Sequence, residues 1–509
     1  MADHATSVFL GLDLGTSSVK ALLVRENGTV AGRGAAEYPT AAPRPGYAEQ
    51  DPEEWWRACG DAVGAALRAA GPETAVAALG LTGQMHGTVL LGADQRPLAP
   101  AVIWSDQRAA DQVHEITGRI GARRLIALAG TPLATGFQAA TLRWCQTERP
   151  DLWARTSHVL LPKDEIRRRL TGVLATEPSD ACGTALLDIS HRDWSDPILA
   201  EMDWDRTLFP PVVASTAITG HLGPDAADAL GLAPGIPVVG GDGDAPAAAL
   251  AAGIRDPRTL FLTLSTGAQV LLPATTVETD PLGRSHTFCA ALDPGPDRPG
   301  WYRMGATLTA GMALRWLRDR VFALDKAEAY PRLMGWADEA PPGANGLLFV
   351  PYLTGERTPH MDPNARGAFV GLTAAHGRSE LVRAVLEGVV FACADAFAVL
   401  AETGSAPSRI VLAGGGARSP LWRQIVADVF GLPVLPLATA DGSALGAALL
   451  AAIGSGALDP AASWAVYEAP VEPDPATHAR YRDLVALFRR QYAIGRETVH
   501  ALAAYERNG

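Results

Sequence analysis

The pattern of hydrophobic and polar positions divides the chain into two halves with the same layout. Residues 8–24 contain an apolar strand, a turn of Gly, Thr and Ser, and a second apolar strand, and residues 259–272 repeat that order. Both segments fit β-hairpins whose turns carry small residues. Because the two copies lie about half a chain apart, the repeat predicts two related α/β domains that face each other across a cleft.

Strand-like and helical stretches alternate around these hairpins. Strands are predicted at 75–81, 158–161, 347–351 and 410–412, and helices at 52–70, 380–400 and 420–430. The first of these helices has a clear start, because Asp51 is a good cap and Pro52 suits the first helical position. We place a first domain at 7–253 and a second at 257–454.

Two further segments fall outside this alternation. Between residues 275 and 300 the chain is rich in Pro, Gly and Asp, which predicts a long surface loop. Residues 477–507 are amphipathic and predict one packed terminal helix. We place that helix in a helical tail over 455–509.

Composition supports a globular protein with more than one domain. The chain has 509 residues, which exceeds the size at which a single core keeps growing, with 48% hydrophobic and 19% charged residues. The net charge of −12 argues against a broad nucleic-acid-binding face, which needs clustered Lys and Arg. A single nucleotide triphosphate stays compatible with that charge, because backbone N–H groups and helix N-termini can hold it.

No segment predicts a membrane or an oxidising compartment. The N-terminus lacks a basic region followed by an apolar run, and the apolar stretch 384–401 is interrupted by Glu387 and Asp395, which predicts a buried helix. The five cysteines form no CxxC pair or Cys/His cluster, so we expect small buried side chains in a reducing compartment. These features predict a cytoplasmic protein without a membrane partner.

The first hairpin turn, at 11–18, is the strongest local candidate for ligand binding. Gly15 lets the backbone approach a ligand, and Thr16 and Ser17 add hydroxyl donors beside the backbone N–H groups. Asp13 ends an apolar strand, and its carboxylate suits Mg²⁺, which prefers oxygen ligands. The residues alone are explained equally well by a plain turn whose Asp bonds nearby backbone.

Two other glycine-rich turns follow apolar strands. Residues 238–245 end in Asp242 and Asp244 just before an Ala-rich helix, so Asp244 is either a general base or a helix cap. Residues 411–420 contain three consecutive glycines, which would let a flat or anionic ligand lie on bare backbone. That stretch lacks the GxGxxG pattern, so a dinucleotide-binding oxidoreductase is disfavoured.

Taken together, the three turns resemble those of the FGGY family of carbohydrate kinases. The resemblance covers residues 7–500 and includes the specific stretches 49–56, 103–108, 160–164 and 351–360. It implies the two-domain actin/hexokinase-like (ribonuclease H-like) ATPase fold, with a central cleft, and transfer of phosphate from ATP to a sugar hydroxyl. A homodimer is compatible with this family, although the sequence shows no interface.

The resemblance implies a role for each matching residue. Asp244 corresponds to the catalytic base and Asp13 to the Mg²⁺-side aspartate. The sugar would contact Asp244 together with Met85, His86, Trp104 and Asp106. The nucleotide would contact Gly15, Thr16, Ser17, Ser265, Thr266, Gly267, Gly311, Gly414, Gly415, Gly416 and Arg418. Within the family, the sugar-side stretch 83–87 is most similar to the branch that acts on xylulose.

Two departures from the family pattern leave the substrate open. Ala245 stands where that branch has Asn after the catalytic Asp, which removes a side chain able to bond sugar hydroxyls. Ser265-Thr266-Gly267 replaces Gly-Thr-Ser in the second phosphate turn. A kinase for ribulose, gluconate, erythritol or glycerol is therefore an alternative, and so is a non-catalytic nucleotide-binding regulator or chaperone-like ATPase of the same fold.

Overall fold

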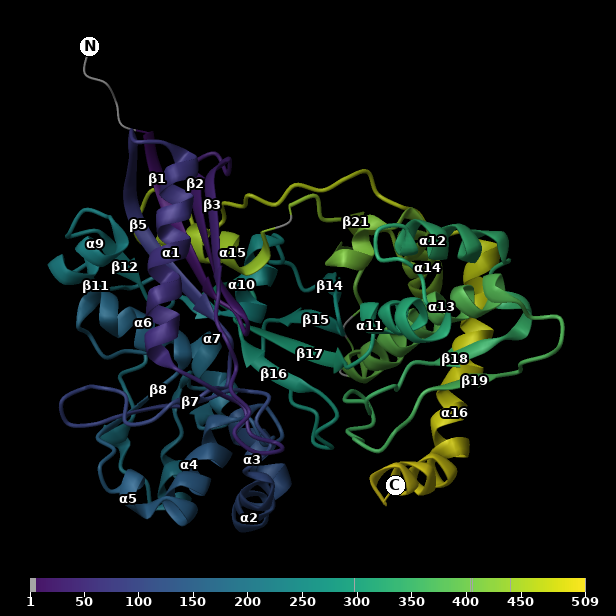
Figure 1. Ribbon diagram of the computed structural model, residues 1–509, viewed down its shortest axis with the longest axis horizontal. Coiled ribbons are helices and arrows are strands. Elements are labelled where there is room, and N and C mark those ends of the chain that lie inside the picture. Colours follow the sequence, from purple (N-terminus) through teal and green to yellow (C-terminus); the bar gives the residue numbers. More distant parts are fainter. Residues whose placement is uncertain (1–5, 297, 403, 405, 440, 509) are drawn as a thin grey trace.

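Two α/β lobes make up the protein, as Figure 1 shows for the computed structural model. The structure describes residues 6–296, 298–402, 404, 406–439 and 441–508. The strands of the first hairpin lie in one lobe, and those of the second hairpin lie at the edge of the other. The last residue of the predicted tail, 509, lies outside the described residues.

The first lobe is built on a sheet in the order β11-β12-β5-β1-β2-β3. Its strands are β1 (Thr6–Leu14), β2 (Ser18–Arg25), β3 (Val30–Glu37), β5 (Thr74–Gly83), β11 (Ile218–His221) and β12 (Pro237–Val239), and the short β13 (Asp242–Gly243) also pairs with β5. Strands β1, β2 and β3 are antiparallel, whereas β5 and β12 continue the sheet in parallel with β1. The turn between β1 and β2 is the predicted first hairpin.

The second lobe repeats this arrangement in the order β16-β17-β15-β14-β20-β21. Its strands are β14 (Thr259–Leu264), β15 (Ala268–Ala274), β16 (His286–Cys289), β17 (Trp301–Thr307), β20 (Arg409–Ala413) and β21 (Val434–Pro436). Here β14, β15 and β17 are antiparallel, and β20 and β21 run parallel to β14. The same three-plus-two topology in both lobes confirms the predicted repeat and the predicted fold class.

Helix α1 (Pro52–Ala70) covers one face of the first sheet at very close range. It begins as predicted, with the Asp51 side chain accepting from the Glu53 backbone N–H. A Cβ atom added at Gly34 of β3 would lie 1.9 Å from the Ala62 carbonyl oxygen of this helix. The glycine therefore sets the distance between helix and sheet.

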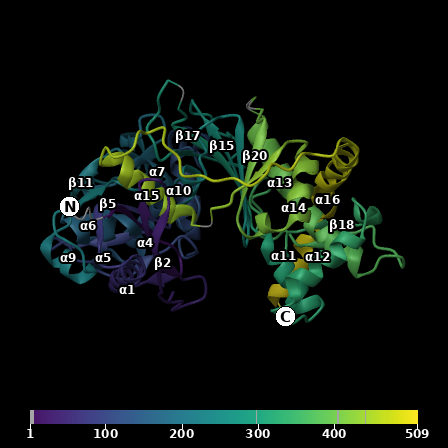
Figure 2. The same ribbon diagram turned by 90° about the horizontal axis from the view of Figure 1, so that it is seen from above.

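Helix α15 (Gly442–Gly454) falls within the range predicted for the second domain but packs on the first sheet (Figures 1 and 2). Its buried side chains share a core with Phe9, Leu22 and Val24 of the first lobe. A Cβ atom at Gly80 of β5 would lie 2.0 Å from the Ala447 carbonyl oxygen of this helix. The chain thus returns to the first lobe after completing the second sheet.

The remaining helices of the first lobe lie between β5 and α10 in sequence. They are α2 (Ala110–Ile120), α3 (Ala122–Ala129), α4 (Gln138–Glu148), α5 (Pro150–Trp153), α6 (Pro162–Thr171), α7 (Pro178–Ala181), α8 (Asp196–Met202), α9 (Pro224–Leu230) and α10 (Asp244–Ala251). Short strand pairs connect them, namely β4 (Glu49–Gln50) with β7 (Ala101–Val102), β6 (Val89–Leu91) with β8 (His158–Leu160), and β9 (Leu187–Asp188) with β10 (Asp193–Trp194).

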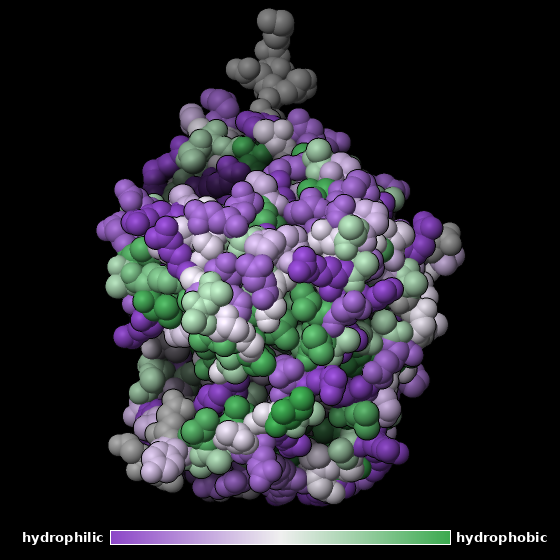
Figure 3. Space-filling view, turned by 90° about the vertical axis from the view of Figure 1, so that its right-hand side faces the viewer, coloured by the Kyte–Doolittle hydropathy of each residue, from purple (hydrophilic) through white to green (hydrophobic). Residues whose placement is uncertain are grey.

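The second lobe has its own helices and one more strand pair. They are α11 (Gly311–Trp316), α12 (Ala329–Glu339), α13 (Arg378–Ala401), α14 (Pro420–Phe430) and α16 (Pro475–Asn508), with β18 (Leu348–Val350) paired to β19 (Ala368–Val370). Figure 3 views this lobe from outside, where hydrophobic residues lie among hydrophilic ones. Helix α13 is long and apolar enough to cross a bilayer, but 83% of its most apolar window is buried inside the protein. The prediction of a buried helix there is confirmed.

The predicted surface loop at 275–300 is wrong in its middle part. Residues of β16 pair with β17 in the second sheet, and all four are buried. Pro, Gly and Asp on both sides of the strand masked its short apolar core. The error matters because β16 also contacts the first lobe, through a bond from the Thr287 backbone N–H to the Gly130 carbonyl oxygen. The five cysteines are all buried and unpaired, as expected.

Candidate active site

The first phosphate turn is held in place by a polar residue that the sequence did not single out. Gln50 donates from Nε2 to the Thr16 carbonyl oxygen at 2.6 Å, while its Oε1 accepts from Trp55 at 3.0 Å and Gln84 at 2.8 Å. Gly15 is fixed from the other side by the Tyr38 hydroxyl, which donates to its carbonyl oxygen. The stretch 49–56 therefore fixes the backbone of the turn that the sequence predicts to bind phosphate.

Asp13 lies at the end of β1 and is nearly inaccessible to solvent. Its Oδ2 accepts from the Ser443 hydroxyl at 2.7 Å, at the start of α15. Its Oδ1 has no hydrogen-bond partner among the described residues, although the atom is buried. Burial raises the pKa of this carboxyl, and the Ser443 bond and the charge of Lys20 oppose that shift. A buried carboxylate oxygen without a partner fits an oxygen-preferring cation.

Asp244 is the first residue of α10, directly after β13. The strand end is anchored by a bond from the Gly243 backbone N–H to the Ser179 hydroxyl at 3.2 Å. Burial, and then the nearby charge of Asp13, raise the pKa of Asp244 to about 7. A carboxyl that titrates near neutrality is suited to accept a proton from an alcohol. The neighbouring Asp242 is fully buried, and burial raises its pKa well above the usual range, so it does not compete for that role.

A fully buried charge cluster supports the backbone beneath Asp244. Lys163 Nζ lies 2.7 Å from Asp164, 3.4 Å from Glu177 and 3.5 Å from Asp180. Arg167 bonds the Gly240 carbonyl oxygen at 2.6 Å, which ties the cluster to the turn before β13. Charged groups this deep need such partners. The stretch 160–164 therefore supports the turn and strand that lead into Asp244.

Met85 packs against Gly243, the residue before Asp244, and both Met85 and His86 pack against Gly183. His86 has a backbone φ of 77°, a left-handed conformation that is uncommon outside glycine and often marks functional sites. Its Nδ1 lies 2.5 Å from the Gly183 carbonyl oxygen, and burial lowers its pKa to about 4. Because a carbonyl only accepts, Nδ1 carries the proton and Nε2 is left as an acceptor. A Cβ added at Gly243 would lie 2.9 Å from Met85 Cγ, so Met85 packs tightly before the base.

The two other predicted sugar contacts, Trp104 and Asp106, have different surroundings in the structure. Trp104 is 39% exposed and donates from Nε1 to the Thr16 hydroxyl at 2.9 Å, so it remains near the phosphate turn. Asp106 is 0% exposed, and both of its oxygens accept bonds, from Arg108 and from the Ala48 backbone N–H. Its carboxylate has no freedom to meet a sugar, so the prediction for Asp106 is corrected to a structural role.

A pocket of about 860 Å³ in the second lobe contains most of the predicted nucleotide-side residues, a size typical of ligand sites. Of these, Ser265, Thr266, Gly311, Gly415, Gly416 and Arg418 line it. Gly414 and Gly267 pack closely against backbone beside the pocket. A Cβ atom added at Gly414 would lie 2.5 Å from a backbone oxygen, and one added at Gly267 would lie 2.4 Å from another. Arg315 was not predicted from the sequence, yet it lines the pocket and donates to the Thr266 hydroxyl at 3.1 Å.

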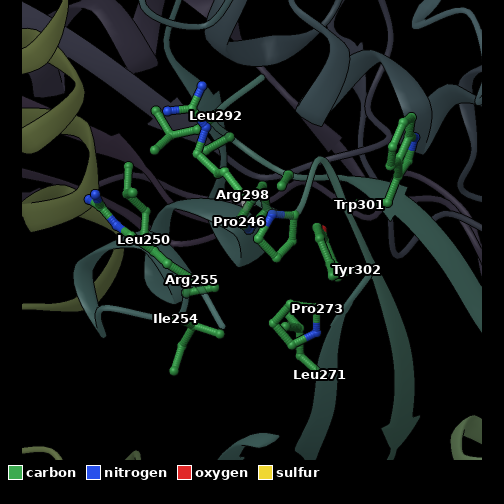
Figure 4. Close-up of a pocket in the computed structure, with 14 residues that line it drawn as sticks. Pro246, Leu250, Ile254, Arg255, Leu271, Pro273, Leu292, Arg298, Trp301 and Tyr302 are labelled. Carbon is green, nitrogen blue, oxygen red and sulfur yellow. The ribbon is translucent and has the colours of Figure 1, made fainter. Parts of the chain in front are cut away.

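A second, smaller cavity is lined in part by residues of α10 (Figure 4). It has about 40 Å³ of space, enough for a few water molecules, and its walls include Pro246, Leu250, Tyr302 and two arginines. It shares no lining residue with the nucleotide pocket.

Comparison with known proteins agrees with this geometry. Models of the N-terminal and C-terminal domains of the FGGY family of carbohydrate kinases match residues 8–251 and 262–455. The xylulose kinase of Escherichia coli is 40% identical over 95% of this chain and 98% of its own length. The gluconokinase of Bacillus subtilis is 30% identical over 89% of both chains. The crystal structure of xylulose kinase from Rhodospirillum rubrum has a TM-score of 0.89 and 31% identity, covering 97% of this chain and 100% of that one.

The fold has two lobes with the same topology, and two of its turns are suited to bind phosphate. Together with a carboxyl whose pKa is near neutral, these features define an ATP-dependent phosphotransferase that acts on an alcohol. The chain belongs to the FGGY family of carbohydrate kinases.

Proposed function

We propose that this carbohydrate kinase converts D-xylulose and ATP to D-xylulose 5-phosphate and ADP. The observation that carries the proposal is the placement of Asp244, a carboxyl with a pKa of about 7, directly after Gly243, against which Met85 packs, with His86 next to Met85 in the chain. Similarity to xylulose kinases over nearly the whole chain supports the choice of sugar. A reaction between a free sugar and ATP fits a cytoplasmic location.

In the proposed reaction, Asp244 accepts the proton of the terminal sugar hydroxyl as its oxygen attacks the γ-phosphorus. The hydroxyl groups of Thr16, Ser17 and Thr266 and the N–H groups of both turns steady the phosphates. The adenosine would lie along Gly414–Gly416 and Arg418 in the nucleotide pocket. Most of the rate enhancement in such transfers comes from positioning and charge stabilisation.

Asp13 fits the role of a Mg²⁺ ligand, because its buried Oδ1 has no other partner among the described residues. No cluster of three or more His, Cys, Asp or Glu side chains that could hold a metal occurs in the described part of the chain. That is expected for Mg²⁺, which takes most ligands from water and phosphate. When bound with ATP, the ion would neutralise charge on the phosphates.

The identity of the sugar is tested by a coupled ADP-release assay across ketoses, polyols and sugar acids. Ala245 is 8% exposed and packs in the same core cluster as Met85, so it offers no hydrogen bond where the family pattern has Asn. We expect D-xylulose to give the highest kcat/KM. If gluconate, ribulose, erythritol or glycerol gives a higher value, the xylulose assignment is wrong and the family assignment stands. ADP release that no sugar accelerates would favour a nucleotide-binding regulator instead.

Sugar phosphorylation should lose activity on the acid side of neutral pH. Asp244 must be ionised to accept a proton, and its pKa is raised to about 7, so protonation below that pH removes the active form. We expect log kcat/KM for the sugar to fall with unit slope as the pH decreases below about 7. Binding of ADP, measured in parallel by calorimetry, should vary little. A flat activity profile between about pH 5.5 and 7.5 would contradict this role.

Replacing His86 with Asn should weaken sugar binding selectively. Asn tolerates the left-handed backbone at this position but is shorter than His, so the Nε2 acceptor is lost. We expect the KM for the sugar to rise by about tenfold and the KM for ATP to change by less than about twofold. A variant with a raised KM for ATP alone would place His86 outside the sugar site.

A further inference from the structure

Two side chains of the second lobe belong to the surroundings of His86, one through packed rings and one through its charge, and neither was predicted from the sequence. His286 belongs to β16, the strand hidden in the supposed surface loop, and Arg357 belongs to the stretch 351–360, which matched the family without a role. Both come from the lobe that holds the nucleotide, whereas Met85, His86 and Asp244 come from the other. They are therefore placed to contact a sugar from the opposite side.

His286 is joined to His86 through a group of packed aromatic rings. The His86 ring stacks on Phe137 at 4.1 Å, and Phe137 lies 6.4 Å from the His286 ring, which itself stacks on Phe288 at 5.3 Å. These distances join ring centroids. Phe137 comes from the first lobe, just before α4, and Phe288 from the second. The cluster therefore spans the lobes at the sugar side.

The hydrogen bonds of His286 define which ring nitrogen can accept. Nδ1 lies 2.7 Å from the Thr131 hydroxyl oxygen, and that hydroxyl donates to the Pro132 carbonyl oxygen at 3.0 Å. Since the Thr131 proton is used there, Nδ1 of His286 must be the donor in their bond. Burial lowers the pKa of His286 to about 3, so the ring is neutral and Nε2 is an acceptor. Among the described residues Nε2 has no partner.

Arg357 is fixed by its neighbours while its own side chain stays exposed. Glu356 accepts from the Leu308 backbone N–H at 2.8 Å, and the Thr358 hydroxyl accepts from the Ala306 backbone N–H at 3.1 Å. Both anchors lie at the end of β17, and the β17 residue Met304 is paired with His286 across the sheet. The guanidinium group of Arg357 has neither a hydrogen bond nor an ion pair with any described residue.

The charges around Arg357 do not neutralise it. The carboxyl nearest in sequence is Glu356, and burial raises the pKa of Glu356 to about 8, so it is largely protonated at neutral pH. The positive charge of Arg357 contributes to the lowered pKa values of His86 and His286. A guanidinium group that is partly desolvated and unpaired is suited to bind oxygen atoms that carry negative charge.

We propose that His286 and Arg357 form the second-lobe half of the sugar site. His286 accepts a hydrogen bond from a sugar hydroxyl through Nε2, which replaces a contact that Ala245 cannot make. Arg357 donates to the oxygen atoms at the end of the sugar that receives phosphate. The inference rests on the proposed function. As the sugar oxygen bonds the γ-phosphorus, the bond to the β-phosphate oxygen breaks, the hydroxyl proton passes to Asp244, and Arg357 keeps its protons.

The test uses the variants Arg357→Gln and His286→Phe in the full-length enzyme. Phe preserves ring packing at 286, and Gln at the exposed position 357 removes the charge without filling space. Arg258→Gln is a matched control, because Arg258 is an exposed second-lobe arginine whose ion pair with Asp256 is weak at 3.6 Å. Sugar kinetics and the Kd for ADP are measured for each variant.

We expect Arg357→Gln to lower kcat/KM for D-xylulose by about 100-fold, because a donor to developing charge is lost. His286→Phe should raise the sugar KM by about tenfold with kcat within about threefold. Both variants should keep the Kd for ADP within about twofold, which also shows that they fold. Arg357→Lys should recover part of the lost activity, because a positive charge without the planar fork is restored.

Two results would overturn this inference without affecting the proposed function. If the wild-type enzyme phosphorylates xylulose and both variants match the Arg258→Gln control, the second lobe does not contact the sugar through these residues. If the Kd for ADP rises by the same factor as kcat/KM falls, Arg357 belongs to the nucleotide site. Failure of the wild-type enzyme to phosphorylate any sugar would count against the proposed function instead.

Discussion

Replacing Asp244 with Ala is expected to reduce kcat for sugar phosphorylation by about 1,000-fold or more. The carboxyl lies at the start of α10, is partly buried near Asp13, and has a pKa of about 7, so it can take the proton of the attacking hydroxyl. Without it, the neighbouring Asp242 is a poor replacement, because it is fully buried and burial raises its pKa well above the usual range. The Kd for ADP should stay within about twofold, because the nucleotide pocket lies in the other lobe.

Asp225→Ala provides the matched control for this variant. Asp225 also lies in the first turn of a short helix, α9, but it is exposed on the outside of the first lobe. Its replacement should leave kcat unchanged. An Asp244→Ala enzyme with normal turnover would show that another group is the base.

Replacing Gly80 with Ala is expected to destabilise the protein by about 3 kcal/mol in the free energy of unfolding. The new Cβ would lie 2.0 Å from the Ala447 carbonyl oxygen and 2.9 Å from its carbon, which are backbone atoms of α15. A helix backbone cannot move away as a flexible side chain can, so α15 would separate from the first sheet. Because Ser443 at the start of α15 bonds Asp13, the variant should also bind Mg-ATP more weakly.

Thermal unfolding of Gly80→Ala beside Gly118→Ala measures this effect. Gly118 is exposed within α2, and a Cβ there would meet nothing within 4 Å. Ala is the better helix former by about 0.5–1 kcal/mol, so the control should be as stable as the parent or slightly more so. Equal melting temperatures for the two variants would mean that α15 does not pack on β5 as described.

Local signals were sufficient to predict the elements that frame the site. Asp51 with Pro52 marks a helix start that the structure reproduces at the same residue, and the helix predicted at 420–430 is α14 with the same bounds. The three glycine turns were also located correctly, because each follows an apolar strand and needs small residues. These signals depend only on neighbouring residues in the sequence, so they can be recognised without the structure.

What the sequence did not reveal depends on contacts between distant residues. The strand β16 was hidden by surrounding Pro, Gly and Asp, and it is defined by pairing with β17 rather than by its own pattern. Helix α15 packs on β1 and β5, which precede it by several hundred residues. Asp106 resembles a ligand in sequence, yet Arg108 and the Ala48 backbone bond both of its oxygens. The roles proposed for His286, Arg315 and Arg357 rest on where the fold brings them.

The most direct test of the proposed activity is ³¹P NMR of the purified enzyme with ATP, Mg²⁺ and D-xylulose. We predict that the γ-phosphate signal of ATP disappears as equal amounts of ADP and a phosphate monoester on C5 of the sugar appear, and that the Asp244→Ala enzyme forms neither at a comparable rate. Release of inorganic phosphate without a sugar phosphate, or a monoester on a different hydroxyl, would contradict this account.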